Sequence, residues 1–507
     1  MLRFGTAGLR GPLREGPDGM NVTTVSRATA GVAAWLRERC LGGGAIVVGR
    51  DARHGSAEFA TATAEIFTAA GFPVTLLPET VPTPVVAFAV KRLGAVAGVQ
   101  VTASHNPPAD NGYKVYLDGG SQLIAPADTE IERCIEAVTE PIARQPVSPS
   151  GAELVDEYLA RVAELPLVLG GVGERAPVRI ALTALHGVGG ELAVRALAAA
   201  GFTDVHVVDE QFAPDPDFPT VAFPNPEEPG AADLLLALAA RVDADVAIAL
   251  DPDADRCAVG VPGPDGWRML RGDETGVLLA DYVLRTAPAD ALVATTIVSS
   301  RLLSRLAPAR SARYAETLTG FKWLARAGEG LVYAYEEAIG HCVDPATVRD
   351  KDGISAAVSA ADLVALSKAA GRTLQDELDS YAVEFGLHAG DQVSLRLPDQ
   401  ATAIALTAAL RAAPPSEIAG TPVKFTDQAQ VRGRLRTDAL IFDADDFRIV
   451  IRPSGTEPKL KCYLEVFAPV PDAAALPGAR VAAADRLAEL AAYCRSLGRA
   501  LRMPDGS

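Results

Sequence analysis

The chain has 507 residues, 49% hydrophobic and 22% charged, which is typical of a globular protein long enough for about three or four domains. Its formal net charge of −17 argues against a nucleic-acid partner, because proteins that bind the phosphate backbone concentrate positive charge. No long uncharged apolar run suggests a membrane span and no apolar N-terminal core suggests a signal peptide, so we expect a cytoplasmic protein without a membrane partner.

The first part of the chain begins with a glycine-rich stretch, FGTAGLRG, at residues 4–11. Its glycines allow close approach of the backbone to a ligand, and Arg10 offers a planar fork for a phosphate group. A flexible N-terminal arm is the structural alternative. Helical periodicity then covers residues 23–39, 57–70 and 85–93, and apolar runs predict strands over 45–49, 74–77 and 95–101. This alternation predicts a mostly parallel sheet, and Asp51, Arg53 and His54 directly follow its first strand.

The strand at 95–101 leads into TASHNP at residues 102–107. The strand is mostly apolar, whereas Thr102, Ser104, His105 and Asn106 are all polar. Ser104 therefore lies beyond the carboxyl end of a strand, where ligands usually bind in such sheets. Pro107 and Pro108 prevent a helix from starting there. A hydroxyl on a stiff turn beside His105 is a candidate nucleophile or phosphoryl carrier, although an ordinary polar turn is the alternative. Residues 111–116 begin with a hairpin-type turn that brings Lys114 back to the same edge.

A second α/β block begins near residue 178, with strands expected at 178–182 and 205–208 and a helix at 191–200. The turn HGVGG at residues 186–190 is not a dinucleotide fingerprint, because Leu192 stands where a third glycine is required. A proline-rich loop follows at residues 214–229.

The strand at 245–250 ends in DPDADR, which carries Asp251, Asp253, Asp255 and Arg256. On an extended segment, carboxylates at i, i+2 and i+4 point the same way, and so much negative charge favours a bound divalent cation. An EF-hand is excluded, because its glycine position holds Arg256 and its bidentate position holds Pro262. The alternative, a solvated acidic turn, is disfavoured because a buried strand precedes the motif and an arginine closes it.

A third block opens with residues 272–274, a helix at 275–284 and a strand at 291–298. A glycine turn follows with Lys322, and the strand at 331–335 leads to Glu336 and Glu337, which could bind a second metal ion or sugar hydroxyls. The acids of residues 350–353 (DKDG) precede a helix and can serve simply as favourable N-terminal charges.

The last block begins near residue 386, with strands expected at 392–397 and 447–451 and a helix at 473–501. Its loop at residues 452–459, RPSGTEPK, combines small hydroxyls, a glycine and two flanking cations, which suits the oxygens of a phosphate group. An exposed hairpin turn is the alternative. The six cysteines are scattered without a CxxC pair, so we expect reduced and mostly buried thiols.

Five of these stretches together resemble the phosphohexomutase superfamily of phosphoglucomutases and phosphomannomutases: FGTAGLRG, TASHNP, DPDADR, EEAIG with DKDG, and RPSGTEPK. They span residues 4 to about 463 in the family's order. The resemblance implies three similar mixed α/β domains and a C-terminal TBP-like α+β domain around a central cleft. We place these domains at residues 1–165, 166–265, 266–385 and 386–507.

The resemblance also implies a set of site residues. Ser104 would be a phosphoserine, and Asp251, Asp253 and Asp255 would hold Mg²⁺ together with a phosphoserine oxygen. Arg10, His105, Lys114 and Arg256 would surround the transferring phosphoryl group. Lys322 and Glu336 would contact the sugar. The phosphate that does not react would be held by Arg452, Ser454, Gly455 and Thr456.

The implied reaction moves phosphate between C1 and C6 of a hexose phosphate, by way of a hexose 1,6-bisphosphate intermediate. Its partners would be small sugar phosphates, and the protein would be a monomer or dimer. One position departs from the pattern: many relatives have a serine where this chain has Ala338. The EEAIG and TLTGFKW forms look more like the branch with phosphopentomutase-type relatives, which leaves that activity as an alternative.

Two other classes of protein compete with this interpretation. A haloacid-dehalogenase-like phosphatase would use an aspartate of a DxDx(T/V) motif as its nucleophile, but the fifth position here is Asp255. A non-catalytic paralogue that binds sugar phosphate and Mg²⁺ would not need every chemical group to be present. A phosphate mapped to Ser104 would separate the mutase from both.

Overall fold

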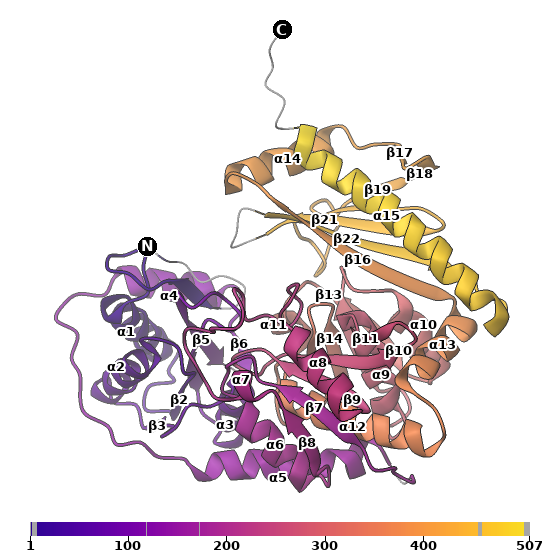
Figure 1. Ribbon diagram of the computed structural model, residues 1–507. Coiled ribbons are helices and arrows are strands. Elements are labelled where there is room, and N and C mark those ends of the chain that lie inside the picture. Colours follow the sequence, from indigo (N-terminus) through magenta and orange to yellow (C-terminus); the bar gives the residue numbers. More distant parts are fainter. Residues whose placement is uncertain (1, 3–7, 118, 172, 455–458, 501–507) are drawn as a thin grey trace. The chain divides into compact units, whose positions relative to one another are not determined.

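The computed structural model describes residues 2, 8–117, 119–171, 173–454 and 459–500 (Figure 1). The chain forms two compact units, one of residues 1–293 with 320–374 and the other of residues 294–319 with 375–507. Within the described ranges no single helix is long and apolar enough to cross a membrane, although the bent pair at 353–369 and 374–385 meets the criteria of length and composition when taken together. The cysteines are all free thiols, and each is buried except Cys40, as predicted.

The first sheet has the strand order β1-β5-β4-β2-β3, with β6 paired to β5. Its strands are β1 (Leu9–Pro12), β2 (Ile46–Arg50), β3 (Val74–Leu76), β4 (Ala97–Val101), β5 (Asp110–Leu117) and β6 (Ser121–Gln122). Its helices are α1 (Val22–Glu38), α2 (Ser56–Ala69), α3 (Thr83–Arg92) and α4 (Ala127–Glu136). Only β2, β3 and β4 run parallel, whereas β1, β5 and β6 pair antiparallel. The three strands from which a parallel sheet was predicted, β2, β3 and β4, are parallel as expected, but β1, β5 and β6 make the sheet as a whole mixed.

The predicted hairpin turn at residues 111–116 is also wrong, because Asn111 and Gly112 lie inside β5. The amide of Asn111 donates to the carbonyl of His54, and its side-chain oxygen accepts from the backbone N–H of Gly112. A Cβ at Gly112 would lie 2.4 Å from the carbonyl oxygen of Thr102. The Asn-Gly pair therefore serves close packing inside the sheet and not chain reversal.

The second sheet has the order β11-β10-β9-β7-β8. Its strands are β7 (Arg179–Thr183), β8 (Asp204–Val207), β9 (Val246–Leu250), β10 (Cys257–Gly263) and β11 (Gly266–Met269). The helices around it are α5 (Glu153–Leu169), α6 (Gly190–Ala199), α7 (Asp209–Phe212) and α8 (Asp233–Val242). Helix α5 continues through residue 165, so the first domain boundary that we placed falls inside a helix.

The third sheet has the order β13-β12-β14-β15. Its strands are β12 (Leu292–Thr296), β13 (Arg313–Thr317), β14 (Leu331–Glu336) and β15 (Gly340–Cys342), and the helices of this region are α9 (Gly272–Leu284), α10 (Leu302–Ala309), α11 (Phe321–Leu324) and α12 (Gly353–Ala369). Nearly every residue of α12 is buried, because it packs against α5, α6, α9, β9 and β10. A helix that is buried on nearly every side is expected to be mostly apolar, and its buried Asp362 is paired with Arg175.

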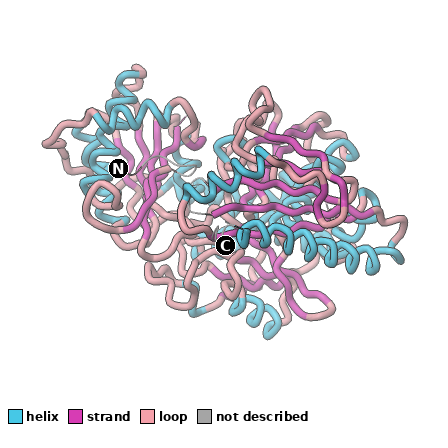
Figure 2. The backbone as a smooth tube through the Cα atoms, turned by 90° about the horizontal axis from the view of Figure 1, so that it is seen from above, coloured by secondary structure: helices cyan, strands magenta, loops and turns pink. Residues whose placement is uncertain are grey.

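The last sheet has the order β16-β22-β21-β20-β19 and is antiparallel throughout. Its strands are β16 (Leu387–Arg396), β19 (Lys424–Asp427), β20 (Leu440–Asp443), β21 (Phe447–Pro453) and β22 (Lys459–Ala468); the other elements here are α13 (Leu374–Phe385), α14 (Gln400–Ala412), the hairpin β17 (Glu417–Ile418) and β18 (Thr421–Pro422), the 3₁₀ turn η1 (Ala473–Ala475) and α15 (Leu476–Ala500). Phe447, Ile449 and Ile451 face a core shared with α14 and α15, whereas Val450 faces Ile297 and Val298. This alternation is the period-two pattern of a strand covered on both faces. Figure 2 shows the long helix α15 running beside these strands.

Candidate active site

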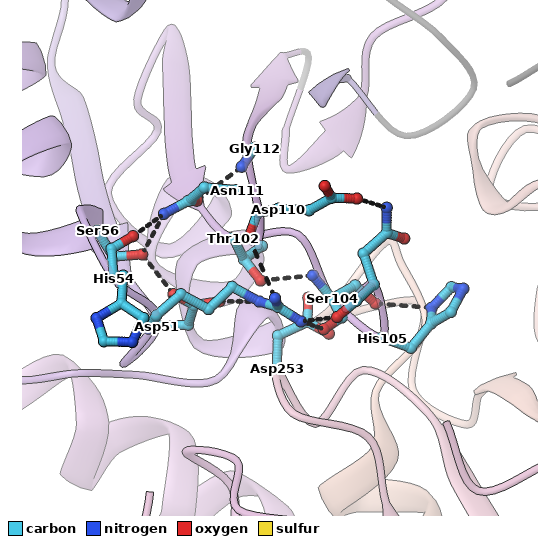
Figure 3. Close-up of polar contacts among 12 residues, drawn as sticks. Asp51, His54, Ser56, Thr102, Ser104, His105, Asp110, Asn111, Gly112 and Asp253 are labelled. Atoms are coloured by element: carbon cyan, nitrogen blue, oxygen red, sulfur yellow. Dashed lines mark hydrogen bonds and ion pairs between the residues drawn. The ribbon is translucent and has the colours of Figure 1, made fainter. Parts of the chain in front are cut away.

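Ser104 lies in the turn that follows β4, as predicted, and its side chain is buried. Its backbone is left-handed, with φ of 52°, a conformation that costs an L-residue about 1–2 kcal/mol. The backbone N–H of Ser104 donates to Thr102 Oγ1 at 2.8 Å, which helps to hold the turn (Figure 3). The Ser104 hydroxyl donates to Asp251 Oδ2 at 2.9 Å, so the structure brings the serine and the acidic motif together.

His105 and Arg10 flank this serine. The imidazole Nδ1 of His105 lies 3.2 Å from Ser104 Oγ (Figure 3). Burial, and secondarily the charges of Arg256 and Arg10, hold the pKa of His105 well below its usual range, so the ring is neutral. Arg10 Nη1 donates to Asn106 Oδ1 at 2.7 Å, which fixes the guanidinium beside the serine turn.

The acidic motif forms a tight loop and not the extended segment that we expected. Strands β9 and β10 pair antiparallel, with Leu250 opposite Cys257, so residues 251–256 close a hairpin. Ala254 has φ of 51°, and this left-handed residue helps to turn the chain. One oxygen from each of Asp251, Asp253 and Asp255 lies within 4.8 Å of the others, and all three side chains are buried. The convergence was predicted correctly, but the backbone geometry behind it was not.

Two glycines from other elements support this loop by close backbone contact. A Cβ at Gly187, in the HGVGG turn, would lie 2.3 Å from Pro252 Cα, and a Cβ at Gly353 would lie 2.4 Å from the carbonyl oxygen of Arg256. Thr83, at the start of α3, holds the loop from the first sheet, since its N–H donates to the carbonyl of Asp253 and its hydroxyl to Asp253 Oδ2 at 2.6 Å. The HGVGG turn of the second block therefore supports the acidic loop by packing closely against it.

Two lysines neutralise part of the acidic loop. Lys114 Nζ, on β5, lies 2.8 Å from Asp253 Oδ2 and 2.6 Å from Asp255 Oδ2. Lys351 Nζ lies 2.8 Å from the same Asp255 oxygen. Burial raises the pKa of Asp255, but the two ammonium groups outweigh it, so the net pKa lies below the usual range. Burial and the charges of Asp253 and Asp255 raise the pKa of Asp251 well above its ordinary value.

The remaining carboxylate oxygens fit a small cation. Asp253 Oδ1 and Asp255 Oδ1 are buried and have no hydrogen-bond partner in the part of the chain that the structure describes. A buried anionic oxygen without a partner is costly, so a ligand that supplies positive charge is expected there. Mg²⁺ prefers carboxylate oxygens and binds through few of them. Among the described residues, these three aspartates are the only group of acids, histidines or cysteines close enough to hold a metal ion, so the second metal site considered for Glu336 and Glu337 is not indicated.

Residues 350–352 link three parts of the first unit. Asp350 Oδ2 accepts from the Tyr116 hydroxyl at 2.8 Å and from Gln122 Nε2 at 2.7 Å. Lys351 reaches Asp255, and Asp352 caps α12 by accepting from the N–H groups of residues 354 and 355. The helix-charge alternative is confirmed for Asp352 as an N-cap, whereas Lys351 is a site residue that the sequence analysis did not assign.

Glu336 is buried at the end of β14, near Arg256. Burial raises its pKa from an ordinary value of 4.5 to about 7, although the charges of Lys351 and Arg256 oppose this. Burial lowers the pKa of Arg256, but Glu336 and Asp251 more than compensate, so the guanidinium stays charged. Arg256 pairs with Gly340 in an isolated β-bridge and lies 3.7 Å from Glu227 of the proline-rich loop. Glu336 is thus a polar group that titrates near neutral pH beside the acidic loop.

The other predicted site residues lie on further elements of the chain. Lys322 lies on α11, with its ammonium 5.9 Å from the Trp323 ring centroid, and within the described residues it makes no ion pair with Glu336 or the acidic loop. Arg452 and Ser454 belong to the second unit, where Arg452 contacts Thr319 Oγ1 and Ser454 N–H donates to the Lys459 carbonyl. Gly455 and Thr456 lie outside the described residues, as do residues 4–7 of the N-terminal stretch.

The fold and this site together define a class of protein: a multidomain α/β protein in which a buried serine and a triad of aspartates share one site. The chain matches four family descriptions in succession, phosphoglucomutase/phosphomannomutase alpha/beta/alpha domain I at residues 1–141, domain II at 156–263, domain III at 271–383 and the C-terminal domain at 394–482. It therefore belongs to the phosphoglucomutase/phosphomannomutase family of phosphosugar mutases. The three α/β domains and the further C-terminal domain expected from the sequence are confirmed.

Individual relatives support the same assignment. The chain is 43% identical to a "Probable phosphomannomutase" of Haemophilus influenzae over 88% of this chain and 93% of that protein. It is 35% identical to the phosphopentomutase of Homo sapiens over 92% and 85%, and 32% identical to a phosphoglucomutase of Staphylococcus aureus over 92% and 90%. A crystal structure of a phosphoglucomutase/phosphomannomutase family protein from Burkholderia thailandensis has the same fold, with a TM-score of 0.72, 22% identity and coverage of 98% and 97%.

Proposed function

We propose that this phosphosugar mutase carries its phosphoryl group on Ser104 and exchanges it between C1 and C6 of a hexose phosphate. The observation that carries the proposal is the 2.9 Å contact between Ser104 Oγ and Asp251 Oδ2, at the centre of the buried aspartate triad. A serine so close to a carboxylate cluster suits phosphorylation only if a cation offsets the added negative charge.

In this proposal Asp251, Asp253 and Asp255 hold Mg²⁺ together with an oxygen of the phosphoserine. The ion, when bound, would polarise the phosphoryl group and draw charge from its oxygens. Arg10, Lys114 and Arg256 stabilise the charge that spreads over these oxygens during transfer. Neutral His105 lies at hydrogen-bond distance from Ser104 Oγ and can hold or release a proton there.

A mutase of this kind also needs a site for the phosphate that does not react. We assign it to the end of β21 and the residues that follow, with Arg452, Ser454, Gly455 and Thr456 as its residues, since hydroxyls, a glycine and an arginine suit phosphate oxygens. The bisphosphate intermediate would turn round and bind through its other phosphate before it rephosphorylates Ser104. Lys322 and Glu336 would contact the sugar. The four domain ranges that we gave remain part of this proposal.

The sugar is proposed to be glucose or mannose phosphate, and the relatives named as a phosphomannomutase and a phosphoglucomutase support this choice. A pentose phosphate is a second candidate, because the human relative is a phosphopentomutase at 35% identity. Hexose 1,6-bisphosphate is proposed as intermediate and activator.

The experiment that tests the proposal is detection of phosphate on the purified protein by intact mass, mapped to Ser104, with turnover measured on glucose, mannose, glucosamine and pentose 1-phosphates. Ser104→Ala should lose both the phosphate and the turnover while keeping its unfolding temperature. Ser121→Ala is a matched control, because that buried hydroxyl has no hydrogen-bond partner among the described residues. Wild-type turnover in Ser104→Ala would refute the proposal, and preferential turnover of a pentose phosphate would select the second candidate.

A further inference from the structure

Arg53 forms a clamp beneath the turn that carries Ser104. Its side chain is 1% exposed, and the residue lies just after β2. Nη2 donates to the carbonyl of Ser104 at 2.6 Å and to that of Asn106 at 2.6 Å. Nη1 donates to the carbonyls of Pro107 and Asp110, at 2.8 Å and 3.2 Å. One guanidinium thus holds three backbone oxygens of the loop between β4 and β5 and a fourth at the first residue of β5.

The guanidinium is itself fixed from two sides. Asp51 Oδ2 lies 3.4 Å from Arg53 Nε, and Asp51 Oδ1 accepts from the Ser56 hydroxyl at 2.6 Å. The guanidinium carbon also lies 4.9 Å from the ring centroid of Phe218, in the proline-rich loop that follows α7. The clamp is therefore anchored in the first α/β domain and is covered by a residue of the second.

We propose that Arg53 is the positioning residue of the phosphoryl-carrying loop, which sets the rate of phosphoryl transfer without touching the sugar; this rests on the proposed role of Ser104. Ser104 holds a left-handed backbone, and the carbonyl of that same residue is one of the four that Arg53 binds. A transferring group must be held within a fraction of an ångström for efficient reaction. Release of the carbonyls would let Ser104 Oγ move away from the aspartate triad.

Only an arginine suits this arrangement. Four acceptors on one side chain require the planar fork of a guanidinium, whereas the compact ammonium of lysine keeps the charge but cannot reach them in the same geometry. Arg53→Lys therefore separates the hydrogen-bond geometry from the charge. A matched control is Arg175, which donates to the carbonyls of Pro166, Gly171 and Gly173 and pairs with Asp362, but clamps a loop that holds no site residue.

The experiment compares wild type, Arg53→Lys and Arg175→Lys by unfolding temperature, by phosphate on Ser104 and by steady-state kinetics with glucose 1-phosphate, primed with glucose 1,6-bisphosphate. We expect Arg53→Lys to retain some phosphate on Ser104 but to lose about 100-fold in kcat, with KM within about threefold of wild type. Arg175→Lys should lower the unfolding temperature and leave kcat unchanged. A wild-type kcat in Arg53→Lys, or an equal loss in Arg175→Lys, would overturn the proposal.

A milder variant keeps the test decisive if Arg53→Lys does not fold. Phe218→Leu removes the covering ring but retains the arginine fork, so kcat should fall about tenfold with little change in KM. An unchanged kcat in Phe218→Leu, when Arg53→Lys cannot be purified, would also count against the clamp. Absence of both phosphate and turnover in the wild type would overturn the proposed function itself, whereas a phosphorylated, active wild type with an insensitive Arg53 overturns only the clamp.

Discussion

Lys351 forms a buried ion pair with Asp255, and Lys114 contacts the same carboxylate oxygen. Each lysine comes from a different part of the chain, so two positive charges converge on one atom of the acidic loop. Burial lowers the pKa of Lys351, but Asp255 and Asp350 more than offset this, so it remains charged. Lys351 is therefore a counter-charge for the aspartate triad.

Lys351→Met should destabilise the protein by about 2 kcal/mol, because removal of one partner leaves buried negative charge less compensated. This loss of stability is smaller than that expected from breaking an isolated buried ion pair, because Lys114 still contacts Asp255. Urea unfolding with and without Mg²⁺ measures the effect. Mg²⁺ should stabilise the variant more than the wild type, because the cation restores the missing charge.

The control for this change is Lys368→Met, which removes an exposed ion pair with Asp245 and should cost less than about 1 kcal/mol, independently of Mg²⁺. An equal response of both variants to Mg²⁺ would show that Lys351 does not balance charge at the cation site.

Removal of one aspartate should weaken the metal site without abolishing it. Asp253→Asn removes one anionic ligand, so the Mg²⁺ concentration for half-maximal turnover should rise at least about tenfold. EDTA should stop turnover of the wild type and added Mg²⁺ should restore it. Stabilisation by Mg²⁺ in thermal unfolding gives a second readout, with Asp245→Asn as a control outside the triad. Full activity in metal-free buffer would refute the assignment.

The raised pKa of Glu336 predicts that substrate binding depends on pH. Its pKa of about 7 means that the carboxylate, which can accept hydrogen bonds from sugar hydroxyls, is the minor form at pH 6 and the major form at pH 8. KM should therefore rise below pH 7 in the wild type. In Glu336→Gln this part of the pH dependence should be absent, with Glu337→Gln as the neighbouring control.

The same group affects stability with a defined sign. In the unfolded chain Glu336 loses its proton near the ordinary pKa of 4.5, whereas in the folded protein it keeps the proton up to a pKa of about 7. Between these two pH values the folded state therefore binds one proton more than the unfolded state. The free energy of unfolding should thus fall as pH rises through this window, at up to about 1.4 kcal/mol per pH unit. Glu336→Gln lacks this loss, so its stability relative to wild type should increase from pH 5 to pH 8. A constant difference would contradict the raised pKa.

Arg452→Ala tests the proposed second phosphate site. Loss of a charge-assisted fork should weaken binding of sugar monophosphate by roughly 2–3 kcal/mol, so KM rises. Phosphate on Ser104 and binding of Mg²⁺ should be unchanged, and more free hexose bisphosphate should be released per turnover, as followed by phosphorus NMR. Arg448→Ala, on the same strand and paired with Asp443, is the control. Unchanged KM and no extra bisphosphate would favour an exposed hairpin turn.

Local signals in the sequence predicted most of the fold and the centre of the site. The turn with Ser104 and the triad were found because polar motifs directly follow apolar strands, and parallel strands β2 and β4 end at one edge. The hairpin shape of the acidic loop was missed, since it depends on the antiparallel pairing of β9 with β10. Helices α4, α10, α13 and α14 were not predicted either. In α10 the internal Pro308 obscures the pattern, whereas the N-cap Asp399 of α14 could have been recognised.

The residues that the sequence analysis missed act through contacts distant in the chain. Thr83, Lys351 and Arg53 each bind a loop more than 50 positions away, and nothing in their immediate sequence indicates the partner. The sequence places Arg53 directly after a predicted strand but indicates no role for it. Its four hydrogen bonds to backbone carbonyls cannot be inferred from residue types.

The contacts of residues 350–352 have a consequence for how the protein is made. During synthesis, Ser104 leaves the ribosome first, followed by Tyr116 and Gln122, the partners of Asp350 on β5 and β6. The three aspartates come later, and Lys351 emerges well after all of these residues. Until the short DKDG segment arrives, the nascent acidic loop has only Lys114 as a lysine counter-charge, and Tyr116 and Gln122 lack their shared acceptor. Final assembly of the proposed site is thus a late event, and a chain interrupted before residue 350 would hold Ser104 and the three aspartates without Lys351.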